Sequence, residues 1–154
     1  MKIAICCDHG GLRLKNEIKK YLDANGYDTV DFGTTNENSC DYPDFALLAA
    51  EAVMRGECEK GVFVCTTGIG ISIAANKVPG IRCALCADPL SAKMTRLHNN
   101  ANVLALGGGY VGDKLAEEIV KTFLETPFSE EAKHQRRIDK ISAIEKKYSK
   151  VTIE

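Results

Sequence analysis

At 154 residues, the chain has the length of one domain and can bury about two-thirds of its unfolded surface. Its 20 Lys and Arg nearly balance its 21 Asp and Glu, so no strong net charge steers it to nucleic acid or to a membrane surface. No apolar run approaches the roughly 20 residues of a membrane span, and the apolar start at Met1–Ile5 is too short for a signal peptide. We expect a single domain over residues 1–148, a short tail over 149–154, and no nucleic-acid or membrane partner.

Strand-like and helix-like segments alternate along the chain. In order, the sequence predicts strand 2–6, helix 12–25, strand 29–32, helix 43–55, strand 61–65, helix 69–77, strand 81–86, helix 89–99, strand 102–106 and helix 111–125. The strands are short apolar runs, and the helices carry apolar residues on one face. This pattern predicts the α/β class, with a three-layer α/β/α, Rossmann-like domain around a five-stranded parallel sheet.

An extra C-terminal helix is predicted over 129–147. Ile138, Ile141 and Ile144 give it an apolar stripe. Spacing places Lys133, Arg137 and Lys140 together on one side. Two interpretations stay open from spacing alone. The basic side is either a solvated surface, or it presents cations to an anionic ligand while the helix packs on a partner subunit.

The seven cysteines are an odd number, and most lie in apolar, strand-like runs. A disulfide scaffold would instead place cysteines in the loops of a smaller, secreted chain. We therefore expect free thiols and a cytoplasmic location. The spacing of Cys83 and Cys86 matches a redox or zinc motif, but residues three apart in a strand point to opposite faces, so that use is the lesser alternative.

The segment from Val62 to Ser72 carries the clearest sign of chemistry. A buried apolar strand ends in Cys65, and a Thr/Gly loop then leads into a helix. Backbone N–H groups at such a helix start attract anions and stabilise a thiolate. The sequence therefore places a reactive sulfur beside a loop that can hold an oxyanion.

Ligands of open parallel sheets bind outside the carboxyl ends of the strands. Five residues should share that rim: Asp8, His9, Cys65, Thr67 and Asp88. We also expect His98 near the same end, since two histidines with a carboxylate and a thiol suit acid–base work. No cluster shows metal-ligand spacing, so the predicted chemistry is metal-free proton transfer next to a carbonyl, with an enediolate held by the loop amides.

A phosphatase loop is the competing interpretation of the first rim segment. Cys7 and Arg13 have the Cys-x5-Arg spacing in which a cysteine attacks phosphorus and an arginine holds the phosphoryl oxygens. However, Asp8 would place a carboxylate inside a cradle meant for a dianion, and Leu14 stands where a hydroxyl residue is usual.

Five collinear motifs resemble the type B ribose-5-phosphate isomerases and their galactose-6-phosphate and allose-6-phosphate isomerase relatives. They span residues 2 to about 148 and comprise Cys7-Asp8-His9-Gly10-Gly11, Asp41-Tyr42-Pro43-Asp44, Gly68-Ile69-Gly70-Ile71-Ser72-Ile73-Ala74-Ala75-Asn76-Lys77, Arg96-Leu97-His98-Asn99-Asn100-Ala101-Asn102-Val103-Leu104-Ala105 and His134-Gln135-Arg136-Arg137-Ile138. The resemblance implies a cofactor-free aldose–ketose isomerase of the pentose phosphate pathway. It also implies a homodimer or tetramer whose active sites are shared between subunits.

The resemblance further implies residue roles. Cys65 would be the base that moves a proton between C1 and C2, and Thr67 would help to stabilise the enediolate. His98 would reach across from the neighbouring subunit to open the furanose ring. The remaining residues would bind the sugar or its phosphate: Asp8, His9, Thr66, Gly68, Ile69, Gly70, Asn99, Lys133 and Arg137.

Three positions depart from the family pattern. Thr66 replaces a glycine, Gly109 replaces an arginine, and Lys133 replaces an arginine. Both arginines bind phosphate in the family. Ribose 5-phosphate is nevertheless the first choice of substrate, because Lys133, Arg137 and His9 still supply cations. The departures keep allose 6-phosphate, galactose 6-phosphate or an unphosphorylated aldose as alternatives. A sugar-phosphate sensor without catalysis is a further alternative, which the intact set of Cys65, Thr67 and His98 disfavours.

Overall fold

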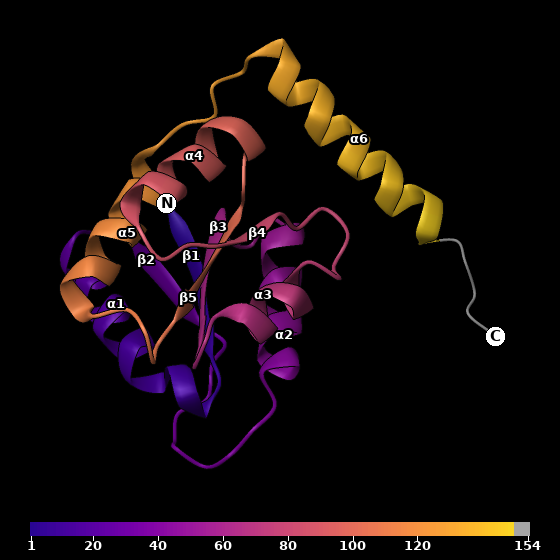
Figure 1. Ribbon diagram of the computed structural model, residues 1–154. Helices are drawn as coiled ribbons and strands as arrows, with labels where there is room; N and C mark the ends of the chain where they lie inside the picture. Colours follow the sequence, from indigo (N-terminus) through magenta and orange to yellow (C-terminus); the bar gives the residue numbers. More distant parts are fainter. Residues whose placement is uncertain (150–154) are drawn as a thin grey trace.

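A computed structural model describes residues 1–149 and forms one parallel sheet with helices on both sides (Figure 1). The strand order is β2-β1-β3-β5-β4, and every neighbouring pair is parallel. The strands are β1 (Lys2–Cys7), β2 (Asp28–Asp31), β3 (Lys60–Cys65), β4 (Cys83–Leu85) and β5 (Val103–Gly107). The predicted five-stranded, Rossmann-like architecture is confirmed.

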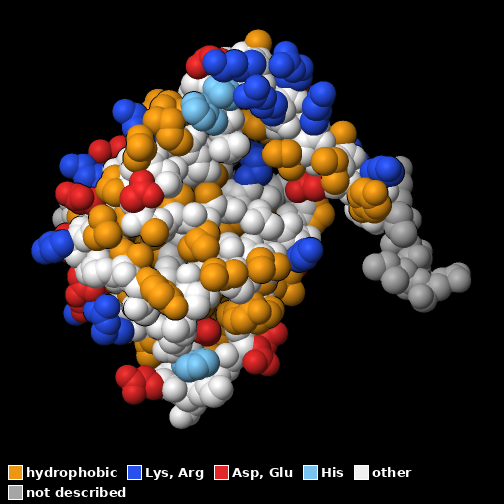
Figure 2. All heavy atoms as spheres, viewed as in Figure 1, with side chains coloured by type: hydrophobic (Ala, Val, Ile, Leu, Met, Phe, Trp, Pro, Cys, Tyr) orange, Lys and Arg blue, Asp and Glu red, His pale blue; other side chains and the backbone are white. Residues whose placement is uncertain are grey.

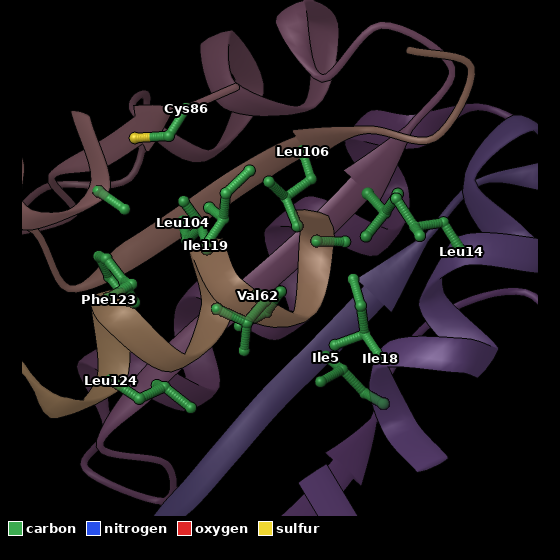
Figure 3. Packing of buried hydrophobic residues seen from close by; sticks show 14 of the residues in the cluster. Ile5, Leu14, Ile18, Val62, Cys86, Leu104, Leu106, Ile119, Phe123 and Leu124 are labelled. Carbon is green, nitrogen blue, oxygen red and sulfur yellow. The ribbon is translucent and has the colours of Figure 1, made fainter. Parts of the chain in front are cut away.

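The helices occupy the two outer layers. They are η1 (His9–Gly11), α1 (Leu12–Ala24), α2 (Tyr42–Met54), α3 (Ile69–Ala75), α4 (Pro89–Asn99), α5 (Asp113–Glu125) and α6 (Ala132–Tyr148). One face of the sheet packs on α1 and α5, as Figure 3 shows around Ile18 and Val62, with α4 beside α5. The other face packs on α2 and α3.

Successive strand residues point to opposite faces of the sheet, and both faces are buried under helices. In β3, Val62 and Val64 enter the core under α1 and α5, whereas Phe63 and Cys65 enter the core under α2 and α3. A strand buried on both faces needs a continuous apolar run, which is why this stretch carried no alternation in the sequence.

The C-terminal helix begins three residues later than predicted. Residues 126–131 form an extended linker, and Glu130 adopts a positive φ of 57°, which a helix cannot contain. Beyond this linker α6 projects away from the sheet (Figure 1), and its buried residues are His134 and Ile138. Among residues 1–149, no helix combines the length and apolar character that a membrane crossing needs.

Other boundaries differ by a few residues. The largest difference is β4, which covers 83–85 instead of 81–86, and α3 ends at Ala75 instead of Lys77. The side chain of Asn76 explains where α3 ends and where β4 begins. Its Nδ2 donates to Ser72 O at 3.0 Å and to Cys83 O at 2.9 Å, and its Oδ1 accepts the Cys83 N–H at 2.8 Å. The predicted tail 149–154 lies outside the described residues except for Ser149.

Candidate active site

Cys65 is the last residue of β3, and its sulfur faces the loop that follows. The Gly68 N–H donates to Cys65 Sγ at 3.1 Å, and the Ile69 N–H donates to Thr67 Oγ1 at 3.1 Å. The Cys65 residue is 4 % exposed, so one side of the thiol is packed in the core and the other meets the loop. The predicted pairing of a strand-end sulfur with loop amides is present.

Glycines allow this loop to close tightly. Gly68 has a φ of 75°, and a Cβ atom there would lie 2.5 Å from Leu85 Cδ1 and 2.8 Å from the carbonyl carbon of Leu106. A Cβ atom at Gly70 would lie 2.5 Å from the ring of Tyr42. Tyr42 therefore lies directly against the loop. Tyr42 belongs to the motif Asp41-Tyr42-Pro43-Asp44, for which the sequence predicted no role, and its contact with Gly70 becomes evident only in three dimensions.

The segment after β1 supplies the neighbouring wall of the site. Asp8 is buried, and its Oδ1 accepts the Gly11 N–H at 3.0 Å, which fixes the carboxylate at the start of η1. His9 is half-buried, and its Nδ1 accepts the Cys40 N–H at 3.2 Å. When neutral, this imidazole therefore carries its proton on Nε2, where it can donate to a ligand.

Thr66 joins the two walls. A Cβ atom at Gly10 would clash with Thr66 Oγ1, so the segment after β1 touches the loop after β3 directly. Beside Thr67, a pocket of about 370 Å³ is lined by apolar side chains that include Ile69, Leu85 and Tyr110. The structure thus brings together Asp8, His9, Cys65, Thr66, Thr67, Gly68, Ile69 and Gly70 at the carboxyl ends of β1 and β3. We call this set the thiol half-site.

The expectation that His98 lies at this end is wrong for a single chain. A helix that follows a parallel strand runs back along the sheet, so α4 starts at the carboxyl end of β4 and ends, with His98 and Asn99, at the amino end of β5. His98 stacks there on His134, with ring centroids 4.3 Å apart and planes 16° apart.

Lys133 and Arg137 lie on α6 beside this stack. Together, His98, Asn99, Lys133 and Arg137 form what we call the cationic half-site. Figure 2 shows histidine side chains at both ends of one face, with those at one end lying beside a concentration of Lys and Arg. Asp88 lies at the carboxyl end of β4, on the predicted rim, where it caps α4 by accepting the Ser91 N–H at 2.7 Å.

The phosphatase interpretation fails on geometry. Cys7 is fully buried on the face opposite Cys65, and desolvation raises the pKa of its thiol to about 12. Arg13 points to α5, where its guanidinium pairs with Asp113 at 2.7 Å. A phosphate loop needs an accessible thiolate beside an available arginine, and this segment has neither.

The seven cysteines are all free thiols. Burial also raises the pKa of Cys86 to about 11 and raises that of Cys83, which leaves these thiols protonated at neutral pH. Within residues 1–149, no three His, Cys, Asp or Glu side chains lie close enough together to hold a metal ion.

Comparison with known proteins places this geometry in one family. The family described as Ribose/Galactose Isomerase matches residues 3–141. Ribose-5-phosphate isomerase B of Escherichia coli is 46% identical over 146 residues, which is 95% of this chain and 97% of that protein. A solved structure of Clostridium thermocellum ribose-5-phosphate isomerase B superposes with a TM-score of 0.94 at 55% identity, covering 96% of this chain and 99% of that one.

Relatives of similar identity carry other substrate names. D-erythrulose-4-phosphate isomerase of Pectobacterium atrosepticum is 43% identical and covers 83% of this chain and 85% of that protein. A galactose-6-phosphate isomerase subunit of Clostridium acetobutylicum is 41% identical and covers 94% of this chain and 83% of that protein. This chain belongs to the Ribose/Galactose Isomerase family and is an aldose–ketose isomerase of sugar phosphates.

Proposed function

We propose that the protein interconverts ribose 5-phosphate and ribulose 5-phosphate, with Cys65 as the base. The observation that carries the proposal is the contact of Cys65 Sγ with the Gly68 N–H at 3.1 Å, at the end of β3. A hydrogen bond to sulfur stabilises its anionic form, and a thiolate is the form that can take a proton.

The reaction proceeds through an enediolate. The Cys65 thiolate removes the C2 proton of the open-chain aldose, and the C–H electron pair forms the C1–C2 double bond while the carbonyl pair moves to O1. Return of the proton to C1, with transfer of the O2 proton to O1, yields the ketose. The Gly70 amide lies in the first turn of α3, where it lacks a helical acceptor, and together with Thr67 it supplies donors to the enediolate oxygen.

A complete site requires two copies of the chain. The thiol half-site holds the base, whereas the cations that suit a phosphate belong to the cationic half-site at the other end of the sheet. In a homodimer, the partner subunit's His98 and the partner subunit's Arg137 would complete the pocket around Cys65. Exposed apolar side chains beside the loop, including Ile69, Leu85 and Tyr110, favour such an interface, because patches of this kind mark association surfaces.

The substrate choice follows from charge. Lys133 and Arg137 supply cations for a phosphate, and His9 offers a donor at Nε2. Gly109 offers no cation, which keeps allose 6-phosphate, galactose 6-phosphate and unphosphorylated aldoses as alternatives. Free thiols suit a cytoplasmic enzyme of pentose phosphate metabolism.

Turnover of these sugars by the wild-type protein ranks the substrates. We expect ribose 5-phosphate to give the highest kcat/KM, and no turnover of any sugar would refute the proposal. Cys65→Ala should lose turnover at least about 100-fold and still bind ribose 5-phosphate, since general-base catalysis contributes about 10²–10⁴-fold. Cys7→Ser is the matched control: it keeps a donor toward Thr34 O and should stay active. A sensor would show little change with Cys65→Ala.

A further inference from the structure

The two members of the stacked His98–His134 pair differ in solvent exposure, and the proposed reaction gives this difference no role. His98 is exposed at the end of α4, whereas His134 is only 5 % exposed in the first turn of α6. His134 Nε2 is buried and has no hydrogen-bond partner among residues 1–149, and Glu131 Oε1 lies 3.9 Å away. A buried polar group without a partner costs free energy, so its placement calls for a compensating role.

The surrounding backbone fixes this arrangement. The linker before α6 is fastened to the two residues that precede His98: Arg96 Nε donates to Thr126 O at 3.1 Å, and the Ser129 N–H donates to Leu97 O at 3.2 Å. One turn after His134, Ile138 is buried and anchors α6. His134 is therefore held in place against one face of the His98 imidazole, which is otherwise exposed to solvent.

Burial and charge distinguish the two members of the pair. Burial disfavours the charged form of an imidazole, and a second positive charge in contact with it would be repelled. Burial first, and then the neighbouring charges of His98, Lys133 and Arg137, lower the pKa of His134, and Glu131 only partly offsets them. Glu131 itself pairs with Lys133 at 2.8 Å. The exposed ring of His98 is the member of the pair that solvent and a ligand can reach.

We propose that His134 is a positioning residue for ring opening: its buried ring holds the exposed His98 imidazole in one orientation toward the sugar. This inference rests on the proposed function, in which the partner subunit's His98 meets the cyclic sugar. The C1–O4 bond breaks, its electron pair goes to O4, and O4 takes the proton of the imidazolium. The C1 hydroxyl proton passes to the Asp8 carboxylate as the C1 carbonyl forms.

The test separates ring opening from proton transfer between carbons. Ribose 5-phosphate is mostly cyclic, whereas ribulose 5-phosphate is open-chain and exchanges its C1 hydrogen with solvent deuterium through Cys65 alone. His134→Leu should lower kcat on ribose 5-phosphate about 10-fold and leave the deuterium exchange within about two-fold, since a general acid contributes at least that much. His134→Phe keeps a stacking ring and should restore most of the rate. Gln135→Ala, an exposed neighbour on α6, should match wild type.

Three outcomes would overturn the inference: no loss with His134→Leu, an equal loss in turnover and exchange, or no rescue by His134→Phe. Failure of the proposed function is distinguishable, since wild-type protein would then neither turn over ribose 5-phosphate nor exchange ribulose 5-phosphate. The stack itself is tested independently by NMR of ¹⁵N-histidine-labelled protein. The His98 ring protons should lose their ring-current shift in His134→Leu and keep it in His134→Phe.

Discussion

Gly109 and Thr66 lie against each other at the edge of the thiol half-site. The Gly109 N–H donates to Thr66 O at 2.9 Å, and a Cβ atom at Gly109 would lie 3.1 Å from Thr66 O and 3.3 Å from Thr66 Cγ2. These are two of the three positions at which the chain departs from the family pattern. The threonine methyl occupies space beside residue 109, so the two departures are physically coupled.

The coupling predicts how an arginine could be restored. Gly109→Arg alone should strain the contact with Thr66 and destabilise the protein by about 1 kcal/mol, since overpacking costs about 1–3 kcal/mol. Thr66→Gly removes the methyl contact and leaves only the one to the carbonyl oxygen, so it should relieve part of the strain. The arginine should then lower KM for ribose 5-phosphate about 10-fold, as one charged hydrogen bond contributes roughly 1.5–3 kcal/mol. Thermal unfolding and kinetics of the four proteins of this double-mutant cycle check both effects. Strictly additive changes in Tm and KM would show that the two positions are independent.

Loop closure predicts a contrast between two glycines of equal backbone conformation. Gly68 and Gly26 have φ of 75° and 79°, but a Cβ atom meets three close atoms at Gly68 and nothing within 4 Å at Gly26. Gly26→Ala should cost about 1 kcal/mol of unfolding free energy from left-handed strain alone. Gly68→Ala should cost about 2 kcal/mol more and abolish turnover, because the Gly68 N–H would leave Cys65. Urea unfolding curves measure the difference, and equal midpoints would contradict the crowding.

Buried thiols predict a loss of stability at alkaline pH. The pKa of Cys86 rises to about 11 in the folded chain, so an unfolded chain releases this proton first as pH increases. The folded state then holds more protons, and the unfolding free energy falls between pH about 9 and 11 by at most about 1.4 kcal/mol per pH unit for this thiol. Cys86→Ala should flatten the decline relative to wild type in urea unfolding from pH 8 to 10. An unchanged slope would contradict the assignment.

Thiol accessibility gives a further prediction at the rim. Cys40 is half-buried with its sulfur 3.8 Å from His9 Nδ1, whereas Cys7 is fully buried with a pKa of about 12. At pH 8, iodoacetamide should modify Cys40 and leave Cys7 intact, since only thiolates react. Peptide mass spectrometry locates the adducts, and bound ribose 5-phosphate should slow labelling at Cys40. Labelling of Cys7 before Cys40 would show that the first rim segment is open.

The local sequence pattern predicted the sheet, its layers and the thiol half-site, because strand ends and glycine-containing loops depend on residues that are adjacent in the sequence. It failed for His98, since that residue's position depends on the direction of α4 relative to the sheet. The helix-reversal rule could have given that result from the sequence. The contact of Tyr42 with Gly70 and the stacking of His98 on His134 join segments that are distant in the chain, and no periodicity encodes them.

In the enzyme that we propose, one active site combines the thiol half-site of one copy with the cationic half-site of another. Cys65→Ala and His98→Asn proteins should each be nearly inactive on ribose 5-phosphate. When the two variant proteins are unfolded, mixed and refolded together, random pairing makes half of the dimers hybrid, and each hybrid holds one intact site. We predict recovery of about a quarter of wild-type activity, as expected for a closed two-fold dimer. A mixture as inactive as its two components would contradict it.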